Sequence, residues 1–153
     1  MSTKLTIEQV ATLSGFSTRS IRGFIKNGFL EGDKSTGKWL FTFEQYQAFT
    51  NHPAISPTVS SKKLAGILSF LNEPLEDNNR ICVILDVRKE DAKAATKFFL
   101  TRLAEFETED ADMTYSSDTV PNGSRHIIYG THKDVTAFLE GYEAVLHTER
   151  END

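Results

Sequence analysis

Residues 14–28 read SGFSTRSIRGFIKNG, and this stretch decides the fold of the N-terminal third of the chain. Gly15 stands where a preceding helix would end in the left-handed conformation, and Ser17 is a favoured cap for a following helix. The apolar spacing predicts this second helix over about residues 18–27, with Gly28 ending it. Its apolar side chains and its cations fall on opposite sides: Ile21, Phe24 and Ile25 on one, and Arg19, Arg22 and Lys26 on the other.

The flanking residues complete a small module. Thr6-Ile7-Glu8-Gln9 and Thr42-Phe43-Glu44-Gln45 are capping boxes, in which a threonine hydroxyl and a glutamine side chain satisfy each other's backbone amides. They predict a short helix before the glycine turn and another that starts at the second capping box and carries Tyr46 and Phe49 inward. Between these helices we expect two strand-like pieces, 29–31 and 38–41, joined by the polar turn 32–37. The predicted order is helix, turn, helix, hairpin, helix.

A second module is predicted after a linker. Residues 53–60 contain two prolines and no helical or strand period, so we interpret them as the linker between residues 1–52 and 61–148. The apolar patterns place the later elements as follows: a helix at about 61–72, a strand buried on both faces at 81–87, a helix at about 89–106, strands at 113–117 and 126–129 joined by an Asn-Gly hairpin loop at 117–124, and a helix at about 132–147 before a charged tail at 149–153.

This order of elements indicates an α+β fold. Helix, strand, helix, strand, strand, helix fits a small three-stranded sheet with helices on one face. It is similar to a ferredoxin-like arrangement that lacks its last strand.

Composition and charge divide the chain in the same way. The 153 residues are 39% hydrophobic and 25% charged, which is typical of a globular protein with one ordinary domain or two small ones. The net charge is −5, yet residues 1–53 hold six Lys/Arg and four Asp/Glu, a net +2, and the remainder hold eleven and eighteen, a net −7. Such a split suggests two modules with different partners. A basic first module is compatible with nucleic acid.

Several function classes are disfavoured by the sequence. It has no apolar run near the ~20 residues of a membrane span, and Met1–Lys4 lacks a signal peptide's apolar stretch, so we expect a cytoplasmic protein. Cys82 is the only cysteine and falls in a buried-looking strand, while the four histidines have no metal-ligand spacing. The chain also carries no phosphate-binding loop or hydrolase motif. We therefore expect neither enzymatic activity nor a cofactor or metal.

Residues 5–50 resemble the DNA-binding domain of MerR-type regulators and of the related excisionase-like modules. The resemblance is carried by LTIEQVA at 5–11, SGFS at 14–17 and SIRGFIKNGFL at 20–30. Those families usually have Leu-Arg-Tyr-Tyr-Glu where this chain has IRGFI at 21–25, and Gly-Tyr-Arg where it has GKW at 37–39. The resemblance implies a winged helix-turn-helix that binds double-stranded DNA.

The basic stripe and the resemblance together predict the DNA contacts. Cations on the second helix can enter a groove or hold phosphates, hydroxyls at its N-terminal end can reach bases, and the hairpin can contact the flanking backbone. Trp39 fits either this surface or the core. The predicted set is Ser17, Thr18, Arg19, Ser20, Arg22, Lys26, Lys34, Ser35, Thr36, Lys38 and Trp39.

MerR-type regulators usually dimerise through a long helix after the winged domain, and the predicted 61–72 helix is only about three turns long. We expect the second module to supply the dimer contact or to sense a small-molecule effector. The dimer contact is predicted at the apolar stripe Leu64, Ile67, Leu68 and Leu71.

The sequence thus predicts a bacterial MerR-like transcriptional regulator that binds double-stranded DNA as a homodimer. Two alternatives stay open: an excisionase-like architectural factor, and a protein-interaction adaptor whose winged domain has lost DNA binding.

Overall fold

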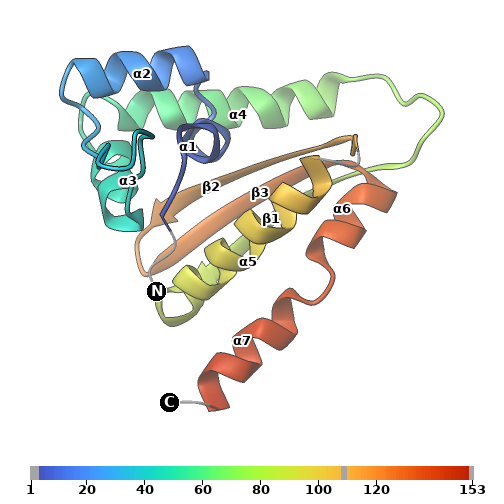
Figure 1. The fold of residues 1–153 in the computed structure, drawn as a ribbon. Helices are drawn as coiled ribbons and strands as arrows, with labels where there is room; N and C mark the ends of the chain where they lie inside the picture. Colours follow the sequence, from blue (N-terminus) through green and yellow to red (C-terminus); the bar gives the residue numbers. More distant parts are fainter. Residues whose placement is uncertain (1–3, 108–109, 152–153) are drawn as a thin grey trace. The chain divides into compact units, whose positions relative to one another are not determined.

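The computed structural model describes residues 4–107 and 110–151 (Figure 1). The chain divides into two compact units, Met1–Leu68 and Ser69–Asp153. The first unit contains three short helices and most of a longer one: α1 (Ile7–Ser14), α2 (Thr18–Lys26), α3 (Phe43–Thr50) and α4 (Ser56–Asn72). The second unit contains the remaining elements: β1 (Arg80–Arg88), α5 (Lys89–Glu107), β2 (Met113–Val120), β3 (Gly123–Thr131), α6 (His132–Leu139) and α7 (Tyr142–Glu151).

Both predicted capping boxes are confirmed. The Thr6 hydroxyl accepts a hydrogen bond from the Gln9 amide at 3.2 Å, and the Gln9 side chain accepts one from the Thr6 amide at 2.9 Å. Thr42 and Gln45 repeat the arrangement at 3.1 and 2.9 Å. Gly15 ends α1 in the left-handed region, with φ +81°. Local sequence therefore sets where these helices begin and where α1 ends.

An aromatic cluster holds α2 against the rest of the first unit. The Phe24 ring lies 4.9 Å from the Phe16 ring and 5.2 Å from the Phe49 ring, measured between centroids. Ile21 on the same helix is fully buried. Because this side of α2 faces inward, its opposite side is left at the surface.

The hairpin after α2 is shorter than predicted. Asp33 and Leu40 form a single bridge, with backbone N–O distances of 2.8 Å in both directions. Phe41 bridges Leu5 instead of the 29–31 segment, which forms no strand. The Phe29 amide donates to the Phe24 carbonyl at 2.9 Å, so the turn that ends α2 occupies this segment.

The predicted linker at 53–60 is wrong, because α4 begins inside it at Ser56. Pro57 lies in the first helical turn, where its missing amide costs no helical hydrogen bond. Ile55 and Val59 are buried, which anchors the start of the helix. The division between the units falls within α4, after Leu68.

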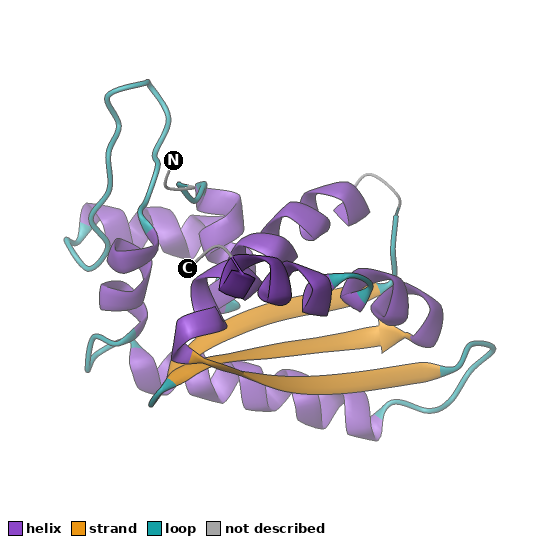
Figure 2. Ribbon diagram, turned by 90° about the horizontal axis from the view of Figure 1, so that it is seen from below, coloured by secondary structure: helices purple, strands orange, loops and turns teal. Residues whose placement is uncertain are grey.

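The second unit is built on a three-stranded antiparallel sheet in the order β1-β3-β2 (Figure 2). α5 connects β1 to the parallel β2, and β3 lies between them, as in the first part of a split β-α-β arrangement. α5 and α6 pack on the same face of the sheet, where Phe99 and Phe138 both contact Tyr115. The predicted α+β class and three-stranded sheet are confirmed.

The expectation that the first strand is buried on both faces is wrong. β1 is an edge strand of an antiparallel sheet, and the Ile84 side chain on its open face is 54% exposed. Apolar side chains also occur at protein surfaces, so an apolar run does not by itself establish that both faces of a strand are covered. The sequence alone did not separate the two cases.

Two boundaries differ from prediction at tight backbone positions. The loop expected at 117–124 is a two-residue turn, with β2 running to Val120 and Asn122 at φ +65°. The helix expected at 132–147 is broken into α6 and α7 at Gly141, whose φ is +89°. The apolar stripe continues across this interior glycine, which is why the sequence pattern indicated one helix.

A buried polar network lies between the sheet and its helices. His126 is fully buried and its two ring nitrogens lie 2.8 Å from the Tyr115 and Ser124 hydroxyls. Burial raises the pKa of the Tyr115 phenol well above its ordinary range. The network satisfies buried polar groups in an otherwise apolar layer. Within the described residues, no helix is long and apolar enough to cross a membrane.

Candidate nucleic-acid interface

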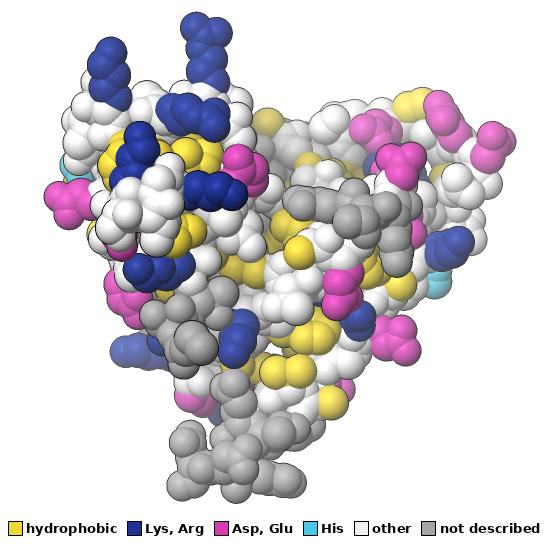
Figure 3. Space-filling model, in the orientation of Figure 1, with side chains coloured by type: hydrophobic (Ala, Val, Ile, Leu, Met, Phe, Trp, Pro, Cys, Tyr) yellow, Lys and Arg dark blue, Asp and Glu magenta, His cyan; other side chains and the backbone are white. Residues whose placement is uncertain are grey.

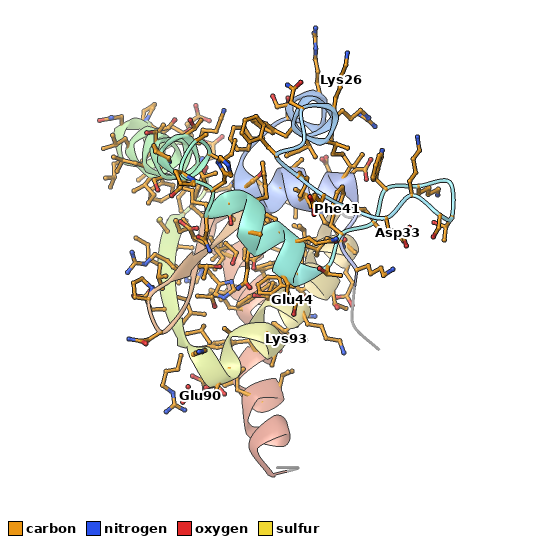
Figure 4. The ribbon with its side chains drawn as sticks, turned by 90° about the vertical axis from the view of Figure 1, so that its left-hand side faces the viewer. Lys26, Asp33, Phe41, Glu44, Glu90 and Lys93 are labelled. Atoms are coloured by element: carbon orange, nitrogen blue, oxygen red, sulfur yellow. The ribbon has the colours of Figure 1, made fainter. Side chains whose placement is uncertain are left out.

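The cations of α2 lie at the surface, as predicted. Arg19, Arg22 and Lys26 are exposed on the side opposite Ile21. Figure 4 shows Lys26 projecting away from the unit, whereas Phe41 lies inside it. Burial of the apolar side of α2 therefore fixes the direction in which its positive charge points.

The N-terminal end of α2 is occupied by its own cap. The Ser17 hydroxyl accepts a hydrogen bond from the Ser20 amide at 3.1 Å and lies 3.0 Å from the Ser20 hydroxyl. Thr18 and Ser20 are half-buried, whereas Ser17 is exposed. A ligand at this end would contact hydroxyls that are already held in place by capping.

Asp33 gives the hairpin a fixed shape. Its carboxylate accepts a hydrogen bond from the Ser35 amide at 2.8 Å and lies 3.4 Å from the Lys4 ammonium. The hydrogen bonds from Ser35, helped by Lys4, lower the pKa of Asp33 below its ordinary value. The Gly37 amide closes the turn on the Lys34 carbonyl at 2.9 Å. Lys34, Ser35, Thr36 and Lys38 are thereby displayed on an ordered exposed turn.

A groove of about 840 Å³ joins α2 to the hairpin within the first unit. Arg22 and Lys26 line it from α2, and Lys34 and Lys38 line it from the hairpin. Lys and Arg side chains gather over these elements around a smaller apolar area (Figure 3). Cations from two separate elements thus form one basic surface, to which Trp39 also contributes.

Trp39 packs against the hairpin and also lines the groove. Its ring stacks on Phe41, with centroids 6.3 Å apart and planes 12° apart, and the Lys34 ammonium lies 5.6 Å from its centroid. The side chain is half-buried and also lines the groove. Trp39 therefore supports the hairpin and gives the groove a flat apolar wall.

The cations of this surface lack acidic partners. Within the part of the chain that the structure describes, no carboxylate lies within ion-pair distance of Arg22, Lys26, Lys34 or Lys38, and the same holds for Arg19, which lies outside the groove. By contrast, Arg88 and Arg125 in the second unit are paired with acids. Cations that share a surface without such partners repel one another and are stabilised by a polyanion.

The groove includes some predicted residues and excludes others. It does not include Ser17, Thr18, Arg19, Ser20, Ser35 or Thr36. It does include Thr6, Glu8 and Ile25, which were not predicted. Thr6 and Glu8 reach it because α1 starts beside the hairpin, through the Leu5–Phe41 bridge. That contact is tertiary, so no local sequence pattern reveals it.

The predicted dimer stripe is exposed on α4. Leu64 is 57%, Leu68 48% and Leu71 69% exposed, and Ile67 is half-buried. The buried positions of the helix are instead Val59 and Lys63. Three leucines at spacings of four and three residues thus form an exposed apolar stripe on one helix.

The metal-ligating residue types and the cysteine provide no further candidate site within the described residues. Within the described residues, no cluster of three His, Cys, Asp or Glu side chains could hold a metal ion. Burial raises the pKa of the Cys82 thiol, which makes it a weaker nucleophile.

Comparisons of the chain with protein-family models, with curated proteins and with solved structures find no match.

Proposed function

We propose that the chain is a non-enzymatic, cytoplasmic MerR-like transcriptional regulator that binds double-stranded DNA through its first unit. The observation that carries the proposal is the groove in which Arg22, Lys26, Lys34 and Lys38 converge without carboxylate partners among the described residues. In this assignment α2 is the recognition helix and the hairpin is the wing.

The chemistry of each part suits a duplex. The guanidinium and ammonium groups would neutralise phosphates, which gives affinity without sequence preference. The exposed turn Lys34–Lys38 would lie along the sugar-phosphate backbone of the DNA, next to the major groove that α2 would enter. Glu8 also lines the groove of the protein, and its carboxylate would repel phosphate. Its favourable contact on a duplex would be a hydrogen bond accepted from the amino group of a cytosine.

The proposal includes a homodimer. One winged unit of this size makes few base contacts, and specific affinity is generally reached when a symmetric dimer reads two half-sites. Leu64, Leu68 and Leu71 supply exposed apolar area for a contact between copies.

Gel-shift titrations with pooled duplex fragments at two salt concentrations test the proposal. We expect binding that weakens steeply with salt, because several phosphates are neutralised. Absence of binding at low salt would refute DNA binding and favour the adaptor. Sedimentation then separates a dimeric regulator from a monomeric, excisionase-like architectural factor.

A further inference from the structure

The two edges of the sheet in the second unit differ in character. β2 presents Thr114, Ser116 and Asp118 along the open face of one edge. β1, at the other edge, reads RICVILDVR, and between its terminal arginines Asp86 is its only charged residue. Native edge strands are normally protected from pairing by charged side chains, especially lysines, by prolines, by bulges or by a covering helix or loop. β1 has neither lysine nor proline.

Among the described residues, no strand pairs with the outer side of β1. In the split β-α-β arrangement a fourth strand would pair with β1, but after β3 the described chain continues as α6 and α7. Ile81, Val83 and Leu85 on the helix-covered face of β1 are only half-buried, and Ile84 on the open face is mostly exposed. This nine-residue strand, apolar except for Arg80, Asp86 and Arg88, therefore has one side paired to β3 and the other without a strand partner among the described residues.

We infer that this edge pairs with β1 of a second copy of the chain, antiparallel and centred on Val83, which adds a specific contact to the dimer of the proposed function. Side chains alternate between faces, so only registers that pair positions of the same parity keep the two helix-covered faces together. Centring on Val83 places Arg80 opposite Asp86 of the other copy, twice, by the two-fold symmetry. Ile81 then faces Leu85, and Cys82 faces Ile84.

Charge complementarity selects this register over its neighbours. Centring on Ile84 would place Arg80 opposite Arg88 at both ends, and like charges opposite each other are destabilising. Centring on Cys82 would place Arg80 opposite Ile84. In the register centred on Val83, every position from Arg80 to Asp86 meets a partner of matching chemistry.

Arg80 is held in position for this contact. Its guanidinium lies 5.3 Å from the Phe70 ring centroid and 3.1 Å from the Glu73 carboxylate, and Phe70 packs on Tyr129 of β3. Its Nε is buried without a hydrogen-bond partner among the described residues. Asp86 is fixed by two hydrogen bonds from Arg125, at 2.7 and 2.9 Å. The two charged ends of the seam are thus preorganised on one face of the sheet.

Cysteine trapping in the full chain tests the seam directly. Residues opposite each other in antiparallel strands have Cα atoms about 4.5–5.5 Å apart, within the range of a disulfide, whereas diagonal residues are too far apart. In a Cys82→Ser background, Val83→Cys is expected to form a disulfide-linked dimer on mild oxidation. Ile84→Cys in the same background is the matched control and is expected to stay monomeric in denaturing gels.

Charge exchange provides a second test that does not depend on cysteine. Arg80→Glu and Asp86→Arg should each weaken self-association in sedimentation by about tenfold or more, because two like-charge pairs form. An equimolar mixture of the two variants should associate like the unaltered chain. In the mixed dimer the new glutamate of one copy faces the new arginine of the other, and the unaltered Asp86 faces the unaltered Arg80, so both pairs are complementary.

The outcomes that overturn the inference are distinct. Trapping through Ile84→Cys rather than Val83→Cys overturns the register. A dimer that neither cysteine traps, and whose charge variants do not complement, overturns the edge and assigns association to the leucines of α4. A chain that sediments as a monomer overturns both surfaces, while its gel shifts still decide separately whether it binds DNA.

Discussion

Arg22 is the residue on which the DNA-binding proposal depends most. It lies at the centre of the exposed side of α2, lines the groove and has no carboxylate partner within the described residues. We predict that Arg22→Ala weakens binding to every duplex and reduces the slope of log affinity against log salt by roughly one, because one phosphate contact is lost. Titrations at about 50 and about 200 mM salt measure both effects.

Lys93→Ala is the matched control for this change. Lys93 is an exposed cation on α5 of the second unit (Figure 4), and it is not one of the residues that line the groove. Its removal alters net charge equally and should leave the slope unchanged. Equal effects from the two variants would show that only overall charge matters and would remove Arg22 from the interface.

Burial of Tyr115 predicts that the stability of the second unit depends on alkaline pH. Burial raises the pKa of its phenol, whereas an unfolded tyrosine ionises near pH ~10. Above that pH the unfolded state holds fewer protons than the folded state, so the free energy of unfolding falls as pH rises, and it is unaffected below. We predict that Tyr115→Phe flattens this alkaline dependence in urea titrations at about pH 8 and about pH 11. The half-buried Tyr129→Phe control should retain it.

Among the elements, the hairpin carries a prediction of its own. Lys34→Glu with Lys38→Glu should abolish DNA binding, because both cations line the groove and reversal places acids beside phosphates. Both side chains are exposed, so the free energy of unfolding should change by no more than about 0.5 kcal/mol for each. The double reversal of Lys89 and Lys93 changes net charge by the same amount on α5 and should leave binding largely intact. Retained affinity in the hairpin variant would mean that the hairpin points away from the duplex.

The β2–β3 turn requires a glycine at position 123 because the backbone of β1 lies too close for a side chain. A Cβ atom on Gly123 would lie 2.0 Å from the Val87 carbonyl oxygen, so Gly123→Ala must displace β1 from β3. We predict a loss of about 1–3 kcal/mol in the free energy of unfolding. The control is Gly23→Ala in α2, where a Cβ meets nothing within 4 Å and a gain of about 0.5–1 kcal/mol is expected. Denaturant unfolding of both variants should give opposite signs.

Features of the fold that depend on interactions between residues close in the sequence were predicted better than those that depend on distant residues. The capping boxes at Thr6 and Thr42 and the end of α1 at Gly15 are decided within a few residues, and all three were predicted. The start of α4 and the break at Gly141 required weighing a proline or glycine against a continuing apolar pattern. Whether β1 is central or at an edge depends on its pairing with β3, which is distant in the sequence. No local pattern contains that information.

In the candidate site, too, the features set by local sequence were predictable and those set by tertiary contacts were not. The exposure of Arg19, Arg22 and Lys26 follows from helical periodicity, and the sequence predicted it. The participation of Thr6 and Glu8 follows from the bridge between Leu5 and Phe41 and could not be predicted. The sequence therefore predicts which side of α2 carries the cations, whereas only the fold shows that the start of α1 also lines the groove.

At the scale of the whole molecule, the exposed leucines of α4 predict association between copies. Leu68→Glu should lower self-association measured by sedimentation and, if two half-sites are read together, should weaken DNA binding as well. Because Leu68 is about half exposed, the substitution should cost little in the stability of the single chain. Thr101→Glu on an exposed position of α5 is the control. A dimer indifferent to Leu68→Glu would exclude this stripe as the contact.

The pairing register of β1 also has a consequence for how the protein is made. Each β1 residue meets a β3 residue that leaves the ribosome 35 to 51 positions later, from Arg88 with Gly123 to Arg80 with Thr131. β2 and β3 are joined by two residues and can pair at once, whereas closing the longer loop is slower. During synthesis β1, the most apolar of the three strands, therefore has no strand partner until β3 has left the ribosome. Conditions that slow translation between residues 88 and 131 should lengthen that wait and favour aggregation of the nascent chain.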